Sequence, residues 1–385
     1  MKKILHWNPR FGNSIGGGEI YISNIIQNMP GFEHLVLSDK ILPEVRLKDY
    51  EQFEKNILYS APPNIMKPKW LNFPINVIMD IMKQKGRKNI YKKLQPDLNI
   101  IHGLGLFGSL ERLKFLTGID LIGDDYFSNI EPKILTVHNL YSPIMLKNDS
   151  RYSNYETNLF KQFETFICID KNIFTHIKAK YPSKEVHFIP NSIPEHFFNN
   201  RLHKKRFDPK EPVVGFVGRF EYSRGIHILK RLVVESPNNF KFIFVFSASP
   251  SNKQKINDEF SSNTRVKLFF NIPNVLLPDY YRKMDFLFNP VLAQGISRVS
   301  LEAMAMGVIP LMLDIGDRYP IKDFKTGILF VEPKLDELID KVKNISSAEY
   351  YEIQKNAMVL AKEKFSNYKI IPKLVEIYKK SILHG

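Results

Sequence analysis

The sequence predicts an α/β protein with two doubly wound domains, and three observations support this fold class. Short apolar runs alternate with amphipathic stretches from end to end, as in parallel sheets whose strands are linked by helices. The chain has 385 residues, more than the roughly 250–300 at which one hydrophobic core stops growing. A polar, basic and proline-containing stretch, NNRLHKKRFDPKEP, interrupts the alternation. It predicts a domain boundary near residue 205.

In the first domain, residues 1–205, apolar runs mark the strands. KKILHWNP is expected to be the first strand, followed by a glycine loop and a helix from Glu19 to about Met29. LNIIHGL, KILTVHN and TFICID are short apolar runs that end in polar or glycine residues, as buried parallel strands do, and VHFIPNSI closes this half. The only cysteine, Cys168, lies in TFICID and is expected to be a buried structural thiol. A single cysteine forms no internal disulfide, which favours a reducing cytoplasm.

A second series of strands is predicted in residues 206–365, at PVVGFVG, FKFIFVFS, RVKLFF, DFLFNP and VIPLML. The helix that connects the last two should start near Ser297 and end at Gly307, as a right-handed crossover with a C-terminal glycine. Residues 366–385 are predicted to form a C-terminal helix that packs back on the first domain. Ligands of such folds bind at the carboxyl ends of the strands, so we expect the chemistry in the loops that follow them.

The chain is strongly basic, with a formal charge of +15, which predicts an anionic partner. Residues 61–95 hold eight cations against one acid, Asp80, together with apolar residues. Two interpretations remain for this segment: it binds an anionic membrane surface, or it is a helix with one solvated face and one face on the core. We found neither a signal peptide nor a membrane-spanning run, which predicts a cytoplasmic protein, soluble or peripheral at the inner face of the membrane. The basic residues match no nucleic-acid-binding module, so no nucleic-acid partner is expected.

The stretch QGISRVSLEAMAMGVIP combines a helix start with an acid in an apolar helix. The amides of Gly295, Ile296, Ser297 and Arg298 are predicted at a helix N-terminus on the ligand edge of the sheet, where anions bind. Glu302 lies four residues beyond Arg298 on the same helix face. Either Ser297 caps the helix while Arg298 and Glu302 pair, or the acid has a ligand as its partner, because a buried acid needs one.

Two further loops follow predicted strands. GRFEYSRG carries Arg219 and Arg224, whose planar guanidinium groups suit bidentate phosphate binding. GNSIGGGE, with Gly16 and Gly17, fits neither the dinucleotide fingerprint nor the phosphate-loop pattern. It is a flexible turn or a place where the backbone approaches a ligand closely. His138 follows the strand ILTV, and this strand-end position makes it a candidate site residue. We found no cysteine and histidine spacing typical of zinc and no serine elbow of the hydrolase type.

GRFEYSRG and QGISRVSLEAMAMGVIP resemble the retaining glycosyltransferases of family 4, and TVHN, VHFIPNSI, YYRKMDFLFNP and KTGILF add weaker similarity. The resemblance covers most of the chain and is thin between residues 40 and 130. It implies the GT-B fold, two Rossmann-like domains facing each other across a cleft, with the acceptor side in the first domain and the sugar-nucleotide donor in the second. It also implies a hexosyltransferase-type reaction, without metal or further cofactor, that moves sugar from a nucleoside-diphosphate sugar to a lipid-linked or polysaccharide acceptor with retention of configuration.

The resemblance also assigns roles to individual residues. Arg219 and Arg224 would hold the donor diphosphate, and Glu302 would accept hydrogen bonds from the ribose hydroxyls. In the remaining roles, His138 would lie beside the transferred sugar, the amides from Ile296 to Arg298 would face the phosphates or the sugar, and Gly16 and Gly17 would approach the diphosphate.

Arg224 stands where the family usually has lysine, and two other departures from the family pattern bear on function. Gln294 stands where the family has the first of two acids, and Ser297 replaces a common glycine. The departure at Gln294 concerns sugar recognition and leaves an inactive sugar-nucleotide-binding protein as one alternative. Another GT-B enzyme, a nucleotide-sugar epimerase or a phosphorylase, is a second alternative.

Overall fold

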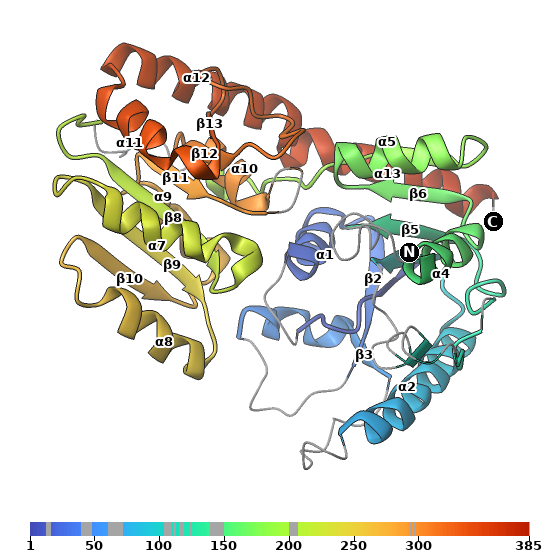
Figure 1. The fold of residues 1–385 in the computed structure, drawn as a ribbon. Helices are drawn as coiled ribbons and strands as arrows, with labels where there is room; N and C mark the ends of the chain where they lie inside the picture. Colours follow the sequence, from blue (N-terminus) through green and yellow to red (C-terminus); the bar gives the residue numbers. More distant parts are fainter. Residues whose placement is uncertain are drawn as a thin grey trace. The chain divides into compact units, whose positions relative to one another are not determined.

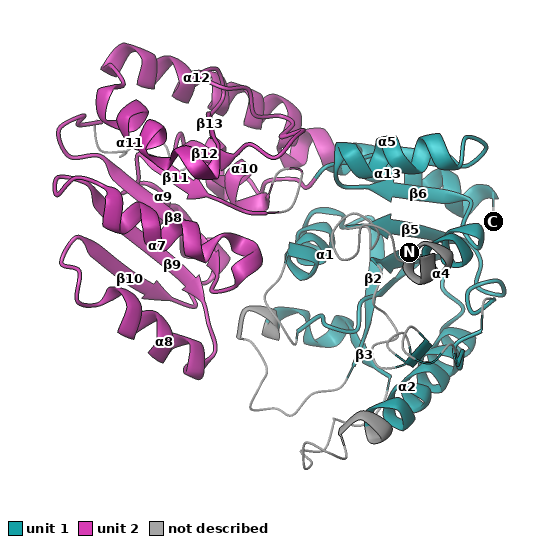
Figure 2. Ribbon diagram, in the orientation of Figure 1, with its two compact units in different colours: residues 1–190, 371–385 teal, residues 191–370 magenta. Residues whose placement is uncertain are grey.

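The structure is a computed structural model of the chain. It describes residues 1–12, 17–39, 48–60, 72–103, 110, 113–114, 117, 119–123, 125–138, 150–199, 207–292, 295 and 297–384. The chain divides into two compact units (Figure 2). Residues 1–190 and 371–385 form the first unit, and residues 191–370 form the second. The predicted boundary at residue 205 lies outside the described residues.

The first unit is built on a parallel sheet whose described strands follow the order β3-β2-β1-β4-β5-β6-β7 (Figure 1). Its strands are β1 (Lys2–Trp7), β2 (Phe32–Ser38), β3 (Ile57–Tyr59), β4 (Leu98–His102), β5 (Lys133–Val137), β6 (Thr165–Cys168) and β7 (Glu185–Phe188). Its longer helices are α1 (Gly17–Asn28), α2 (Asn72–Leu94), α4 (Ser150–Lys161), α5 (Lys171–Lys180) and most of α13 (Asn367–His384). The strand order reverses between β1 and β4, and ligands bind at such switch points in open α/β sheets.

Alternation along the strands gives this sheet two buried faces. Leu5 and Trp7 of β1 belong to a core cluster that also contains Phe160 of α4 and Ile177 of α5. Cys168 is buried in the same cluster, which confirms the expected buried thiol, and burial raises its pKa to about 12. His6, which lies between Leu5 and Trp7 on β1, points to the opposite face of the sheet and is buried as well.

The second unit has a parallel sheet whose described strands follow the order β10-β9-β8-β11-β12-β13 (Figure 1). Its strands are β8 (Val213–Arg219), β9 (Lys241–Ser247), β10 (Val266–Phe270), β11 (Phe286–Asn289), β12 (Ile309–Leu313) and β13 (Ile328–Phe330). Its longer helices are α7 (Ile226–Glu235), α8 (Pro250–Phe260), α10 (Arg298–Ala305), α11 (Leu335–Asn344) and α12 (Ser347–Phe365), and α9 (Leu277–Tyr281) is short. The strand order reverses between β8 and β11, which places the switch point at their carboxyl ends.

Most buried phenylalanines of the second unit lie in one of its two core clusters. Phe244 of β9 and Phe288 of β11 pack in one cluster with residues of α7, α8 and α11. Leu287 of β11, the residue before Phe288, points to the opposite face and joins a cluster with α10 and α12. Both faces of the parallel sheet are therefore covered by helices, as the near-continuous apolar strands require.

The strands expected from the apolar runs are present in both units, and so is the crossover helix between β11 and β12. It begins at Arg298, and Gly307 follows its end with a φ of +70°, the left-handed conformation typical of a glycine after a helix. No helix in the described part of the chain is both long and apolar enough to cross a membrane.

Candidate functional site

Two loops meet at the carboxyl edge of the second unit's sheet, where the strand order reverses. One follows β8, which ends at Arg219, and the other follows the neighbouring strand β11, which ends at Asn289. Gly225 joins the first loop to α7 with a φ of +71° and lies against Pro290 of the second loop. A Cβ atom at this position would lie 2.8 Å from Pro290 Cγ and closer still to its carbonyl oxygen. Glycine is required here both by its backbone conformation and by this close approach.

The first loop carries both predicted arginines. The Arg219 side chain is exposed, and its Nη1 lies 3.0 Å from Oε1 of Glu221. The Arg224 side chain is partly buried, and burial lowers its pKa, as does the nearby guanidinium of Arg219. A guanidinium group stays protonated near neutral pH despite such shifts, so two positive charges lie close together on one strand-end loop. An anion bound there would relieve their mutual repulsion.

The second loop leads into α10. Ser297 occupies the N-cap position, but its hydroxyl makes no capping bond to the first-turn amides. Asn289 Nδ2 instead donates to Ser297 Oγ at 2.6 Å and to Ser300 Oγ at 2.7 Å. The expected side-chain cap is therefore wrong, because the last residue of β11 holds the serine hydroxyl. The amides at the start of α10 are not blocked by this side chain, and helix N-termini attract anions.

Glu302 is enclosed by protein groups. Its side chain is 1% exposed and that of its neighbour Arg298 is 8% exposed, and Arg298 Nε donates to Oε1 of Glu302 at 2.8 Å. The pair across one helical turn, which belongs to the first of the two interpretations, is therefore present. The Tyr281 hydroxyl donates to Oε2 at 3.2 Å and Asn274 Nδ2 to Oε1 at 3.3 Å. Burial and the Glu302 carboxylate raise the pKa of Tyr281 well above its usual value.

The pair with Arg298 leaves one donor unused. Arg298 Nη2 is buried and has no hydrogen-bond partner among the described residues. In this structure the Glu302 carboxylate is satisfied by protein groups, so its assignment to a ribose stays a prediction. The unused Nη2 group marks a second place near α10 where an acceptor atom would be stabilised.

Arg318 holds the second loop in place through hydrogen bonds to backbone carbonyl groups. Its Nε donates to the Leu313 carbonyl at 2.7 Å, its Nη1 to the Gly295 carbonyl at 3.0 Å and its Nη2 to the Val291 carbonyl at 2.9 Å. The guanidinium is buried, so the loop between β11 and α10 is tied to the end of β12 by a rigid group.

The other predicted site residues are distributed as follows. Gly295 is buried with a φ of +83°. Gly17 is the exposed first residue of α1, in the first unit. Gly16, Gln294 and Ile296 lie outside the described residues.

In the first unit, His138 follows β5 at the carboxyl edge of the sheet, as predicted. It lies at the end of β5, one strand beyond β4 and the switch point. Its imidazole contacts that of His102, the last residue of β4, with Nε2 of His138 3.4 Å from Nδ1 of His102. His138 is partly exposed, and burial of its ring lowers its pKa to about 4. It is therefore neutral at pH 7.

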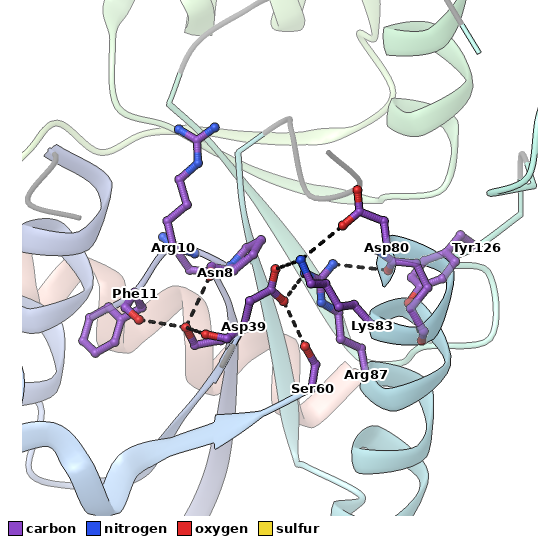
Figure 3. A network of polar contacts seen from close by, with 12 residues as sticks. Asn8, Arg10, Phe11, Asp39, Ser60, Asp80, Lys83, Arg87 and Tyr126 are labelled. Carbon is purple, nitrogen blue, oxygen red and sulfur yellow. Dashed lines mark hydrogen bonds and ion pairs between the residues drawn. The ribbon is translucent and has the colours of Figure 1, made fainter. Parts of the chain in front are cut away.

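A polar network lies at the same edge of this sheet, after β2 and β3 (Figure 3). Asp39 accepts from Arg87 Nη2 at 2.7 Å and from Ser60 Oγ at 2.9 Å, and Lys83 Nζ lies 3.3 Å from its other carboxylate oxygen. Lys83 also pairs with Asp80 at 3.2 Å. Two of the eight cations counted in residues 61–95 are thus buried in ion pairs and do not face a partner surface, which corrects that part of the prediction.

Several residues around α10 were not predicted. Asn289 could have been identified from the sequence, since it is a polar residue at the end of an apolar strand run. No sequence pattern points to Tyr281, Asn274 or Arg318, because each reaches the site from a separate segment of the chain. Within the described residues no cluster of histidine, cysteine and carboxylate side chains is suited to hold a metal ion.

Comparisons with known proteins give a family match to most of the second unit. Residues 198–364 match the family model of glycosyl transferases group 1. This segment contains both loops, the start of α10 and Arg318. No curated protein sequence matches the chain.

Solved structures show the fold. Sucrose-phosphate synthase from Thermosynechococcus elongatus is 16% identical, with 100% of each chain covered and a TM-score of 0.76. HepE of Anabaena, in complex with UDP and glucose, is 17% identical, with 99% of this chain and 100% of that chain covered and a TM-score of 0.70. The lipopolysaccharide outer core galactosyltransferase WaaB is 16% identical, with 99% and 100% covered and a TM-score of 0.60. These matches confirm the predicted fold class of two Rossmann-like α/β domains.

Proposed function

We propose that the protein transfers a sugar from a nucleoside-diphosphate sugar to a lipid-linked or polysaccharide acceptor with retention of configuration. The observation that carries the proposal is the junction of two loops at the β8 and β11 strand ends, inside the segment that matches the group 1 family model. There Arg219 and Arg224 lie on one loop and the start of α10 on the other. A diphosphate is the ligand that such a combination of guanidinium groups and helix amides recognises.

The chemistry follows from the charge that develops during transfer. When the sugar leaves, negative charge grows on the phosphate, and two fixed cations with a helix N-terminus stabilise it. We propose that the leaving phosphate takes the proton of the acceptor hydroxyl on the same face of the sugar, which gives retention and requires neither a protein nucleophile nor a metal ion. Arg219 and Arg224 would then act on the donor at its diphosphate, with Gly16 and Gly17 also approaching that group and His138 beside the transferred sugar.

At position 294 glutamine replaces the family acid. An amide accepts one hydrogen bond and donates another, whereas a carboxylate only accepts, so sugar recognition can persist with altered specificity. We therefore propose an active enzyme. Gln294→Ala should slow sugar transfer by roughly 1 to 3 kcal/mol while leaving the affinity for the bare nucleoside diphosphate unchanged. An equal loss of sugar transfer and of nucleoside-diphosphate affinity would show that Gln294 supports the loop instead.

Binding of UDP to single variants tests the donor site. UDP is the first ligand to use because a similar fold, that of HepE, was solved with UDP and glucose. Arg219→Ala and Arg224→Ala should each weaken binding about tenfold or more, since a hydrogen bond to a charged group contributes roughly 1.5 to 3 kcal/mol.

Arg231→Ala is the matched control, because this exposed arginine of α7 pairs with Glu235 on the same helix. Unchanged affinity in both test variants would refute the assignment, as would an equal loss in the control. Product analysis with UDP-sugars separates transfer from epimerisation and phosphorolysis.

We further propose that α2 brings the enzyme to an anionic membrane surface. Ile78 and Met82 are 57% and 48% exposed on this helix. The exposed lysines of its second half are Lys85, Lys88, Lys92 and Lys93. A surface with apolar residues beside lysines is typical of interfacial helices, and each cation near anionic lipid contributes about 1 kcal/mol.

Vesicle sedimentation tests this second proposal. Replacing the four α2 lysines with glutamine should abolish binding to vesicles that contain anionic lipid. Replacing four exposed lysines elsewhere, Lys355, Lys362, Lys364 and Lys369, should preserve most of it. Equal binding to neutral and anionic vesicles by the unmodified protein would refute the proposal.

A further inference from the structure

Four histidines of the first unit form a continuous hydrogen-bonded row across its sheet. Nδ1 of His34 on β2 lies 2.9 Å from Nε2 of His6 on β1. Nδ1 of His6 lies 2.9 Å from Nε2 of His102 on β4, and Nδ1 of His102 lies 3.4 Å from Nε2 of His138 after β5. The far end of the row is closed by the backbone, because Nε2 of His34 lies 3.2 Å from the Met29 carbonyl oxygen.

The imidazoles of the row are neutral. Burial lowers the pKa of His6 and of His102 well below the usual value, and nearby histidines lower both further. The pKa of His34 is lowered to about 4 by burial, which outweighs the opposing effect of its bond to Met29. A neutral imidazole carries one N–H donor and one acceptor nitrogen, so each member of the row can donate one bond and accept one.

The Met29 carbonyl sets the direction of every bond in the row. A carbonyl oxygen only accepts, so Nε2 of His34 must carry the hydrogen and Nδ1 must accept. His6 must then donate from Nε2 to that nitrogen and accept at its own Nδ1. His102 must in turn donate from Nε2 to Nδ1 of His6 and accept at its own Nδ1, and His138 must donate from Nε2 to that nitrogen. All four rings are therefore Nε2–H tautomers, and the last one, His138, is left with an unprotonated Nδ1.

We propose that this row fixes the tautomer of His138 so that its Nδ1 accepts a hydrogen bond from a substrate hydroxyl. His34, His6 and His102 are positioning residues that act through their neighbour. No described residue bonds to Nδ1 of His138. The ring itself is held by an edge contact with Tyr21 of α1, whose ring centroid lies 5.3 Å away. The identity of the donor group as a sugar hydroxyl rests on the proposed function, whereas the tautomer does not.

The row does not conduct protons away from His138. A carbonyl oxygen cannot take up and pass on a proton at neutral pH, so the chain of bonds ends at Met29. What the row supplies is selectivity. A site with a fixed acceptor favours a ligand that donates a hydroxyl at that point, and it disfavours an analogue in which this hydroxyl is absent or methylated.

Nitrogen NMR of the free protein tests the tautomer directly. With ¹⁵N-labelled histidine, long-range ¹H–¹⁵N correlation separates protonated from unprotonated ring nitrogens, and a His138→Gln variant assigns the signals of His138. We expect a protonated Nε2 and an unprotonated Nδ1 for His138 at pH 7. A protonated Nδ1 in His138 of the unmodified protein would overturn the proposal without any need for a variant.

A matched pair of variants tests the positioning role. The amide oxygen of His34→Asn still accepts from His6, whereas the similarly sized His34→Leu offers no acceptor. We expect the spectrum of His138 to persist in His34→Asn and to shift toward the Nδ1–H form in His34→Leu. An unchanged His138 spectrum in folded His34→Leu would show that the row does not set the tautomer.

Transferase activity of the same two variants provides a second test. If a UDP-sugar is the donor, kcat/KM should fall roughly three- to tenfold in His34→Leu and stay within about twofold in His34→Asn, as loss of one hydrogen bond predicts. A protein that transfers no sugar but shows the expected His138 spectrum would refute the proposed function and keep the tautomer assignment. Equal activity of both variants, with the tautomer changed, would refute the contact between His138 and the substrate.

Discussion

Replacing Gly225 with alanine should damage the donor site and the stability of the second unit together. The backbone φ of +71° is unfavourable for any residue with a Cβ atom by about 1 to 2 kcal/mol. The added Cβ would lie 2.8 Å from Pro290 Cγ and 2.9 Å from its carbonyl carbon, well inside ordinary contact distance. Since the neighbouring group is backbone and a proline ring, the loop must move, and such overpacking costs about 1 to 3 kcal/mol. We expect a total loss of about 2 to 5 kcal/mol.

Two measurements and one control decide this prediction. Urea unfolding followed by circular dichroism reports the loss of stability, and calorimetry reports the affinity for UDP. We expect UDP binding to weaken at least about tenfold, because separation of the two loops moves Arg224 away from the start of α10. Gly31→Ala is the control, since its Cβ would meet no atom within 4 Å. Stability and UDP affinity in Gly225→Ala equal to those of the control would refute the proposed junction of the two loops.

Three further predictions follow from buried charges and buried histidines. The free energy of unfolding should fall as the pH is lowered from about 6.5 to 4, because the unfolded chain protonates its histidines near pH 6.5 while folded His34 resists protonation until about pH 4. This stabilisation is fully present above pH 6.5 and amounts to roughly 3 kcal/mol for His34. Urea titrations across this pH range measure it. The same dependence of the unfolding free energy on pH in His34→Leu as in the unmodified protein would contradict the prediction. Glu302→Gln should destabilise the second unit by about 3 to 5 kcal/mol in urea unfolding, because it leaves Arg298 buried without its counter-charge, and the double variant with Arg298→Met should recover most of the loss. Arg318→Met removes two hydrogen bonds to the loop before α10 and one to the end of β12, and it should weaken UDP binding several-fold in calorimetry, whereas an unchanged affinity would show that the loop holds its shape without them.

Most strands were predictable from their apolar runs, whereas β2, β3 and β13 were not predicted. FEHLVLS forms β2, yet Glu33 and His34 break its apolar pattern, and His34 is buried only because the row gives it hydrogen-bond partners. β3 has three residues, too few to show a period of two. The pattern therefore failed where a strand depends on a specific side-chain partner or on its neighbour in the sheet.

The residues of the candidate site also fall into those that the sequence could predict and those that it could not. Residues that belong to one local motif, such as Arg219, Arg224 and the pair of Arg298 with Glu302, could be identified from spacing. Tyr281 could not, because it reaches Glu302 from a helix that precedes β11. The histidine row could not be predicted either, since it depends on which strands are neighbours in the sheet and on their register.

The division of the chain into units has a consequence for the order of folding. The first unit consists of two separate pieces, residues 1–190 and 371–385, and the second is one continuous piece between them. Ile193 and Ser366 pair at the two ends of that piece, with the Ile193 amide 2.7 Å from the Phe365 carbonyl, so its ends are already joined. In the first unit, by contrast, Tyr378 of α13 is buried and packs against Phe32 of β2. During synthesis the second unit can therefore complete its fold before the first, which reverses the usual order and leaves Phe32 of β2 without its contact to Tyr378 until residues 371–385 emerge.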